Sequence, residues 1–137
     1  WTYDPLDPNA VDGWLVYTGN PATSNLDVMT AGYGYWISAT SDATIGGSGS
    51  LLIPGNTTPP SRNLTAGWNL VGYYQIPGES ESDADGAFAS IGGTAGMTGL
   101  WGFNNETGVF TSVGTILPGD AFWVGLPSVK VYIPSNL

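Results

Sequence analysis

Near the middle of the chain the sequence reads Leu64-Thr65-Ala66-Gly67-Trp68-Asn69-Leu70-Val71-Gly72-Tyr73-Tyr74. This stretch is an apolar run with a glycine at Gly67 and another at Gly72, and it is rich in aromatic and β-branched residues. This composition, the short length and the flanking turn residues favour a β-strand, although a buried helical segment leaves a similar apolar pattern. We therefore expect a central strand over residues 64–74.

The charge balance of the 137-residue chain is acidic but sparse. Eleven acidic residues oppose two basic ones, Arg62 and Lys130, for a formal net charge of −9, yet charged residues make up only 9% of the chain. Such a surface has no basic stripe for nucleic acid or anionic lipid. No stretch approaches the roughly 20 apolar residues of a spanning helix. We expect no nucleic-acid partner and no direct membrane insertion.

Two chemically important residue types are missing. The chain contains no cysteine and no histidine, which removes disulfides, thiolate nucleophiles, the commonest general base and the usual zinc ligands. A glycosidase needs two carboxylates in one cleft, and the spacing singles out no pair, Asp27 with Asp120 included. Lys130 is the only lysine for a Ser-Lys arrangement. We expect a protein that is not an enzyme.

The two halves of the chain repeat one pattern in the same order. Each has a Trp-x-aromatic start, a second strand after a turn, an aromatic-Trp-β-branched triplet and an apolar strand that ends in proline. An internal duplication is the simplest explanation. The matched segments are Trp1-Thr2-Tyr3 with Trp101-Gly102-Phe103, Leu15-Val16-Tyr17 with Val109-Phe110-Thr111, Tyr35-Trp36-Ile37 with Phe122-Trp123-Val124, and Leu51-Leu52-Ile53-Pro54 with Val131-Tyr132-Ile133-Pro134.

One short helix is expected, near residues 83–91. Ala84, Ala87, Phe88 and Ile91 follow the i, i+3, i+4, i+7 spacing of an apolar helix face. Ser82 or Asp83 is a suitable N-cap, and Gly92-Gly93 ends the segment. With this exception the sequence predicts an all-β fold of antiparallel strands, as a sandwich or a partly closed barrel built from an imperfect duplication.

At these motifs the chain resembles a family of β modules in secreted and cell-surface proteins of archaea and bacteria. The resemblance rests on Gly67-Trp68-Asn69-Leu70 and Pro118-Gly119-Asp120-Ala121-Phe122-Trp123. Residues 61–137 look like a complete repeat and residues 1–60 like a truncated one, without the Gly-Trp-Asn strand and the helix. Ala121 stands where the family often has glycine. The resemblance implies an extracellular structural or attachment role, often in S-layer-like proteins, and no shared catalytic residues.

The truncated repeat has a physical consequence. A sheet that lacks an edge strand exposes unpaired backbone groups, which favours pairing with another chain. Three explanations stay open: the chain comes from a longer array, a neighbouring subunit fills the gap, or the central strand serves both halves of one compact domain. We expect a noncatalytic assembly module of an S-layer-like protein, stalk, filament or adhesin, with copies of itself or other surface-protein domains as partners.

The alternative function is a carbohydrate-binding module that uses exposed aromatic residues. Trp36, Trp68 and Trp123 are expected in the core because they recur at equivalent or central strand positions. Trp14 is the best candidate for exposure, since it has no aromatic counterpart at Gly108-Val109. The candidate sugar-stacking residues are Trp14, Tyr33, Tyr35 and Tyr73, with glycans as the partner.

Calcium is the only cofactor that the carboxylates suggest, and the pattern is incomplete. Glu81, Asp83 and Asp85 alternate before a glycine, as at the opening of a calcium loop, but the loop's closing position is Gly92 rather than Glu. A solvated, capped helix start fits the same residues. Asp4, Asp7 and Asp12 form a second candidate set in one proline-containing turn.

Three Asn-x-Ser/Thr sequons are candidate glycosylation sites and favour an extracellular or cell-surface location. They begin at Asn56, Asn63 and Asn105, each beside residues that favour a loop or turn. A chain rich in Asn and Thr also produces sequons by chance. The sequons therefore indicate export only together with the shortage of lysine and the high glycine, threonine and tryptophan content.

Overall fold

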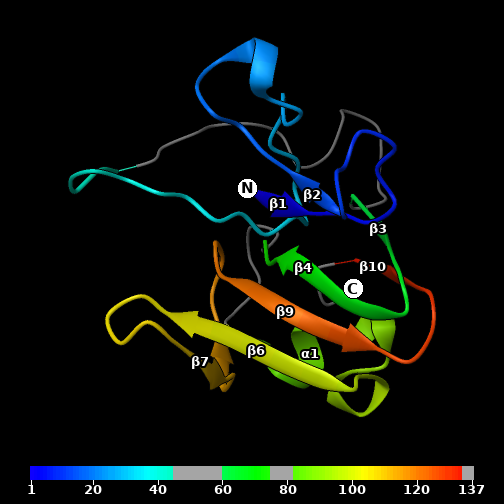
Figure 1. Ribbon diagram of the computed structural model, residues 1–137. Helices are drawn as coiled ribbons and strands as arrows, with labels where there is room; N and C mark the ends of the chain where they lie inside the picture. Colours follow the sequence, from blue (N-terminus) through cyan, green and yellow to red (C-terminus); the bar gives the residue numbers. More distant parts are fainter. Residues whose placement is uncertain (45–59, 75–81, 134–137) are drawn as a thin grey trace, which may run out of the picture.

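The computed structural model describes residues 1–44, 60–74 and 82–133. In these ranges the chain is mostly β-structure with antiparallel pairing and one short α-helix, as the sequence predicts (Figure 1). The described strands form separate sheets and no closed barrel, so the barrel alternative finds no support. The predicted strand at Leu51–Pro54 lies outside the described residues, and the division into units 1–60 and 61–137 stays a prediction.

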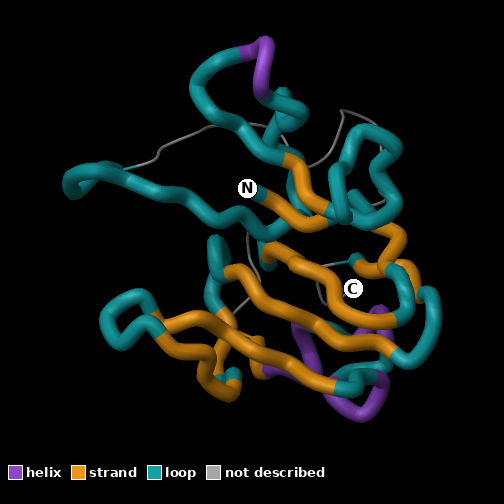
Figure 2. The backbone as a smooth tube through the Cα atoms, in the orientation of Figure 1, coloured by secondary structure: helices purple, strands orange, loops and turns teal. Residues whose placement is uncertain are grey.

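The main sheet has four strands, in the order β4 (Gly67–Gly72), β9 (Ala121–Leu126), β6 (Gly99–Asn104) and β7 (Val109–Ser112) (Figure 1). Alternation along β9 sorts its side chains between two faces. Phe122, Val124 and Leu126 are buried on the inner face, whereas Trp123 lies half-buried on the outer face. Figure 2 shows that most strand structure belongs to the second half of the chain, while the first half is mainly loop.

The stretch over residues 64–74 forms two strands rather than the single strand that we predicted. Leu64 ends β3 (Arg62–Leu64), which pairs with β10 (Lys130–Tyr132), and β4 begins at Gly67 and pairs with β9. Gly67 has φ +90°, a left-handed conformation that suits glycine and lets the chain change sheets. The buried Asn69 amide stabilises this bend by donating to the carbonyls of Thr65 and Gly67, at 3.0 and 3.1 Å.

The hydrophobic core lies between the inner face of the main sheet, the short helix and the β3–β10 pair. Phe88 packs edge-on against Phe122 and tilted against Tyr132, with ring centroids 5.9 and 5.5 Å apart. Aromatic contacts of this kind add to the free energy gained from burial. The core residues are Leu64, Val71, Tyr73, Ala84, Ala87, Phe88, Ile91, Ile116, Phe122, Val124, Leu126 and Tyr132.

The predicted helix is present, although shorter than its apolar pattern. Helix α1 spans Ala84–Ala87 and is followed by a 3-10 turn, η2 (Ala89–Ile91). Asp83 is the N-cap, and its carboxylate accepts a hydrogen bond from the Gly86 amide at 2.7 Å. Gly92 ends the segment in a left-handed conformation, with φ +100°. The predicted N-cap is therefore confirmed, whereas α1 itself ends at Ala87 with Phe88 as its C-cap, and Gly92 ends the 3-10 turn that follows.

The first part of the chain, residues 1–44, forms an N-terminal unit beside the outer face of the main sheet. Its hairpin pairs β1 (Thr2–Tyr3) with β2 (Trp14–Leu15), and a 3-10 turn, η1, spans Pro21–Thr23. Residues 32–34 lie along the free edge of β4, where Tyr33 forms an antiparallel bridge with Val71. Strand β4 thus has antiparallel neighbours on both edges, as the hypothesis of a shared central strand requires.

The two halves use similar pairing registers. Trp1 and Trp36 exchange two backbone hydrogen bonds of 2.9 and 2.8 Å, and Trp101 pairs with Trp123. Tyr3 pairs with Trp14 as Phe103 pairs with Phe110. Phe110 thus lies opposite Phe103 as Trp14 lies opposite Tyr3, while the duplication itself stays a prediction.

The remaining elements complete the cover over the core. Strand β5 (Ser82–Asp83) pairs with β8 (Thr115–Ile116), and a 3-10 turn, η3 (Thr94–Gly96), precedes β6. Ile116 on β8 is fully buried, which fixes this small sheet against the helix. Asn104 accepts hydrogen bonds from the amides of Glu106 and Thr107 and so closes the turn between β6 and β7.

Candidate functional site

The six tryptophans lie on the surface or at the boundary between the two halves of the chain. None of them is buried, because Tyr73, Phe88, Phe122 and Tyr132 supply the aromatic volume of the core. Trp68 is 47% exposed, so the prediction that it belongs to the core is wrong. Trp36 and Trp123 are half-buried, and their side chains take part in contacts between the halves rather than in the core.

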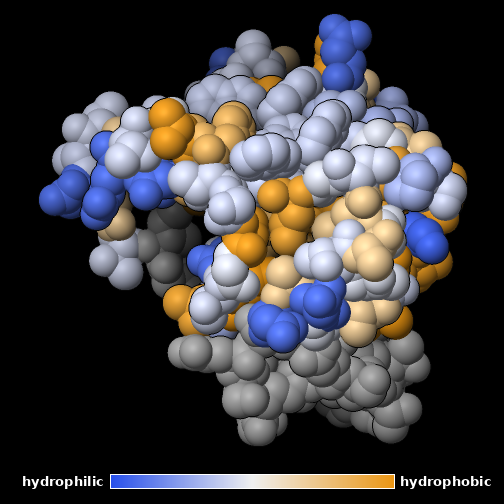
Figure 3. Space-filling view, turned by 90° about the horizontal axis from the view of Figure 1, so that it is seen from below, coloured by the Kyte–Doolittle hydropathy of each residue, from blue (hydrophilic) through white to orange (hydrophobic). Residues whose placement is uncertain are grey.

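An open depression on the outer face of the main sheet is lined by aromatic residues alone. We call it the aromatic hollow; its lining residues are Tyr3, Trp68, Trp101, Phe110 and Trp123. Trp101 and Phe110 are 44% and 51% exposed, and no lining residue is charged. The view from below (Figure 3) shows a surface of mixed character, with hydrophobic residues near its middle and strongly hydrophilic ones among and around them.

Two glycines let the Trp68 indole lie close against the sheet. A Cβ atom at Gly99 would come within 2.8 Å of Trp68 Cη2, and one at Gly125 within 3.2 Å of Trp68 Cζ3. The Trp68 indole therefore extends from β4 across β9 toward β6. A Cβ atom at Gly125 would also lie 2.6 Å from the Thr98 hydroxyl, so this polar group is beside the ring.

Strand β7 is an open edge of the main sheet. In the described part of the chain no strand pairs with its outer side, and all four of its residues are exposed. Val109 and Phe110 are each 51% exposed, and Thr111 and Ser112 add no charge. Natural edges are usually protected by lysine, proline or a bulge, and an edge without such protection favours pairing with another strand.

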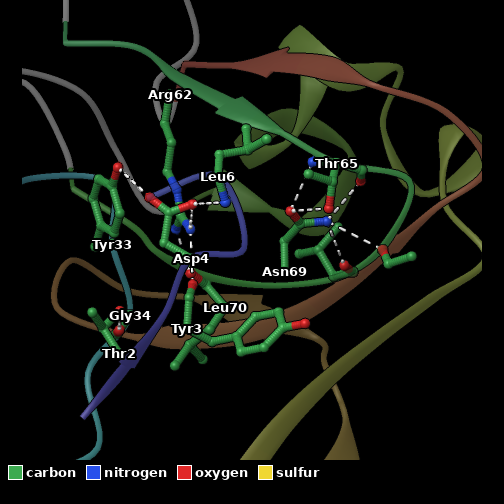
Figure 4. Close-up of polar contacts among 12 residues, drawn as sticks. Thr2, Tyr3, Asp4, Leu6, Tyr33, Gly34, Arg62, Thr65, Asn69 and Leu70 are labelled. Atoms are coloured by element: carbon green, nitrogen blue, oxygen red, sulfur yellow. Dashed lines mark hydrogen bonds and ion pairs between the residues drawn. The ribbon is translucent and has the colours of Figure 1, made fainter. Parts of the chain in front are cut away.

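A buried cluster around Arg62 joins the N-terminal unit to the main sheet (Figure 4). The Arg62 guanidinium donates to the carbonyls of Leu70 and Tyr3 at 2.5 and 2.9 Å, and lies 3.7 Å from the Asp4 carboxylate. It also stacks over the Tyr33 ring, 3.8 Å from its centroid, while the Tyr33 hydroxyl donates to Asp4 at 2.9 Å. One guanidinium thus links both segments of the N-terminal unit to β4.

Burial and the neighbouring charge shift the pKa of Arg62 in opposite directions. Burial lowers the pKa of Arg62, and the negative charge of Asp4 opposes that shift. Burial, and then the hydrogen bond to Asp4, raise the pKa of the Tyr33 phenol to about 12. Arg62 Nε has no hydrogen-bond partner among the described residues, so desolvation of this cation is only partly compensated.

The structure does not bring the candidate calcium ligands together. No group of three or more acidic residues that could hold a metal ion exists in residues 1–44, 60–74 and 82–133. Asp4 faces Arg62, Asp83 caps α1, and Asp85 accepts two hydrogen bonds from Thr94, which lower its pKa. Asp7 accepts a bond from the Asn9 amide, Asp12 is an exposed turn residue with φ +51°, and Glu81 lies outside the described residues.

The predicted stacking residues are largely engaged elsewhere. Tyr73 is only 4% exposed and belongs to the core, which removes it as a sugar-stacking candidate. Tyr33 is held by Arg62 and Asp4, and the Tyr35 hydroxyl accepts a bond from the Thr30 amide at 2.6 Å. Trp14 is half-buried and packs edge-on against Tyr3 and Trp123.

The two sequons in described residues are accessible. Asn63 is exposed on β3, and Asn105 is exposed in the turn between β6 and β7. Asn56 lies outside the described residues. Glycosylation of these asparagines stays a prediction.

Sequence reasoning missed Trp68, Trp101 and Phe110 as exposed residues, and Arg62 as a buried one. The alternation of strand residues carried a signal: Phe122, Val124 and Leu126 form one apolar set on β9, so Trp123 faces the opposite side. Its neighbours Trp101 and Trp68 follow from the register, which the sequence does not specify. Arg62 precedes an apolar strand in a chain with two basic residues, but that position alone does not indicate burial.

No family model, curated protein or solved structure matches the chain. The resemblance to surface-protein modules therefore stays a prediction from the sequence motifs. In the part of the chain that the structure describes, no helix has the length and hydrophobicity of a membrane span.

Replacing Arg62 by methionine tests the importance of the buried cluster. Arg62→Met leaves the Asp4 carboxylate and two backbone carbonyls without their cation, so we expect the free energy of unfolding to fall by about 3 kcal/mol. Urea unfolding followed by tryptophan fluorescence measures the change. Lys130→Met removes the other cation, which is only half-buried, and should cost less than about 1 kcal/mol. Equal losses in the two variants would contradict this role of Arg62.

The raised pKa of Tyr33 predicts a loss of stability at alkaline pH. The folded state holds the phenol proton more tightly than the unfolded state, so this contribution is full below pH 10.0 and is lost as the pH rises toward about 12. Tyr33→Phe removes the titration, so its free energy of unfolding should fall less steeply over that window. Urea titrations at a series of pH values measure both slopes. Tyr74→Phe should act in the same direction because burial also raises the pKa of Tyr74 to about 12. Parallel curves for the wild type and Tyr33→Phe would refute the prediction.

Proposed function

We propose that this chain is a noncatalytic structural and assembly module of an exported cell-surface protein: an S-layer-like protein, stalk, filament or adhesin. The observation that carries the proposal is the open β7 edge. Its backbone is unpaired in the described part of the chain, its side chains are exposed and uncharged, and two of them are large and apolar. These are the properties of a strand that adds to a sheet in another molecule.

Electrostatics favours contact at this edge over contact elsewhere. The chain carries a formal net charge of −9, so two copies repel one another across most of their surfaces. Strand β7 adds no like charges to that repulsion because all four of its residues are neutral. Addition of a strand there satisfies backbone groups and covers Val109 and Phe110 at the same time.

Four of the described carboxylates are engaged in local structure, which supports a noncatalytic role for them. Asp4 faces the buried Arg62, Asp83 caps the helix, Asp85 bonds Thr94, and Asp120 accepts a hydrogen bond from the Leu117 amide at 2.9 Å. Each is engaged in local structure, and the chain lacks histidine and cysteine to supply another base or nucleophile.

We also propose that the two halves derive from a duplicated unit that shares β4. The mutual bonds of Trp1 and Trp36 correspond to the Trp101–Trp123 pair, and both hairpins place an aromatic pair at the same register. Because β4 is paired on both edges, the truncated repeat obtains its missing strand within the same chain. The accessible Asn63 and Asn105 sequons support the extracellular setting.

Two lysines on the β7 edge should prevent assembly through it. Val109→Lys together with Thr111→Lys places like charges on both chains of a paired edge, so we expect the association constant to fall by about tenfold, or about 1.4 kcal/mol. Sedimentation equilibrium over a range of protein concentrations measures the change.

The chain offers a closely matched control for this variant. Val28 and Thr30 are also exposed and also separated by one residue, so Val28→Lys with Thr30→Lys adds the same charge to a surface loop. This control should associate as the wild type does. Equal weakening in the two double variants would contradict association through the β7 edge, because both variants lower the net negative charge by the same amount. A wild type that is monomeric at all concentrations would refute the assembly proposal.

A further inference from the structure

The aromatic hollow presents indole surface that is held in place but uncovered. Trp68 and Trp101 are 47% and 44% exposed, although they belong to the most regular sheet of the protein. They do not fill the core, and Trp123 beside them already packs against Tyr3 and Trp14 of the N-terminal unit. Contiguous exposed apolar surface marks binding sites, whereas apolar residues scattered singly over a surface do not.

The Trp68 ring lies against the sheet, where two glycines leave room for it. Gly99 and Gly125 leave the space that the ring occupies, because a Cβ atom at either position would crowd it, at 2.8 and 3.2 Å. A ring held against a sheet loses little conformational entropy on binding. The Trp101 indole nitrogen would lie 3.4 Å from the same Gly99 Cβ position, so the two indoles meet over β6.

The chemistry of the lining restricts the ligand. A pyranose with equatorial substituents has faces made of C–H groups, which pack on aromatic rings, and a rim of hydroxyls, which need polar partners or water. The hollow supplies aromatic rings, and the Thr98 hydroxyl lies beside Trp68. An unbranched β-linked glycan is a flat ribbon that presents such faces on successive sugar rings. Two neighbouring rings of this ribbon could therefore stack on the two neighbouring indoles.

Charge disfavours anionic ring-stacking ligands. Nucleic acids and acidic polysaccharides are repelled by a net charge of −9. From this neutral lining, the paired indoles and the adjacent hydroxyl, we infer that the aromatic hollow binds a neutral, β-linked glycan, with Trp68 and Trp101 as its stacking residues. This site lies on the outer face of the sheet and shares Phe110 with the β7 edge, but its two stacking residues lie on β4 and β6, outside that strand.

Titration calorimetry with cellohexaose tests the inference, with isomaltohexaose as a neutral glycan of different linkage and shape. The wild type should bind cellohexaose and bind isomaltohexaose more weakly. Trp68→Ala and Trp101→Ala should each weaken binding by about tenfold, or about 1.4 kcal/mol. Trp1→Ala is the matched control, because Trp1 is 45% exposed but does not line the hollow, and it should bind as the wild type does.

Further measurements separate loss of the site from loss of the fold. Circular dichroism must show the wild-type spectrum for each variant, and Trp68→Phe, which keeps a smaller ring, should retain part of the affinity. Absence of binding to cellohexaose by the wild type, or an equal loss in Trp1→Ala, would overturn the inference. A fall in self-association in Trp68→Ala without any sugar binding would also overturn it, and would assign the hollow to contact with a second copy.

Discussion

The buried Arg62 guanidinium is the interaction on which the arrangement of the two halves depends. It bonds the Tyr3 carbonyl, faces Asp4, stacks on Tyr33 and bonds the Leu70 carbonyl of β4. Desolvating a cation is costly, so the cluster is stable only while these groups meet around it. The cluster thereby joins the N-terminal unit to β4 of the main sheet.

This placement determines which surfaces remain free. The N-terminal unit covers Leu70 and contacts Trp123, Phe103 and Phe110 through its own aromatic residues, but it leaves Trp68 and Trp101 exposed. It also pairs with one edge of β4, while β7 at the other end of the sheet stays open. The two candidate functions arise from these uncovered parts: strand addition uses the plane of the sheet, and glycan binding uses its outer face.

The candidate site was predictable in its chemistry but not in its residues. The abundance of tryptophan and tyrosine and the low charge predict aromatic contact as a binding mode, and the hollow is lined by aromatic residues of this kind. From the sequence we predicted Tyr73 as a sugar-stacking residue, but Tyr73 is buried in the core. We also placed Trp68 in the core, where Phe88 and Phe122 already fill the space. Recurrence of a tryptophan in two repeats indicates an equivalent place in a strand and does not say which face of the sheet it occupies.

Local sequence was sufficient to predict the antiparallel strands from aromatic and β-branched runs, the helix with its Asp83 cap, and the glycine at Gly92 that ends the 3-10 turn after the helix. These features follow from propensity and capping, which act over a few residues. Only the tertiary structure decided that the central stretch divides at Gly67 between two sheets, that β4 serves both halves, and that Arg62 is buried between them. These outcomes depend on contacts between residues far apart in the chain, and the free energy of such contacts is set by packing, register and desolvation rather than by local sequence.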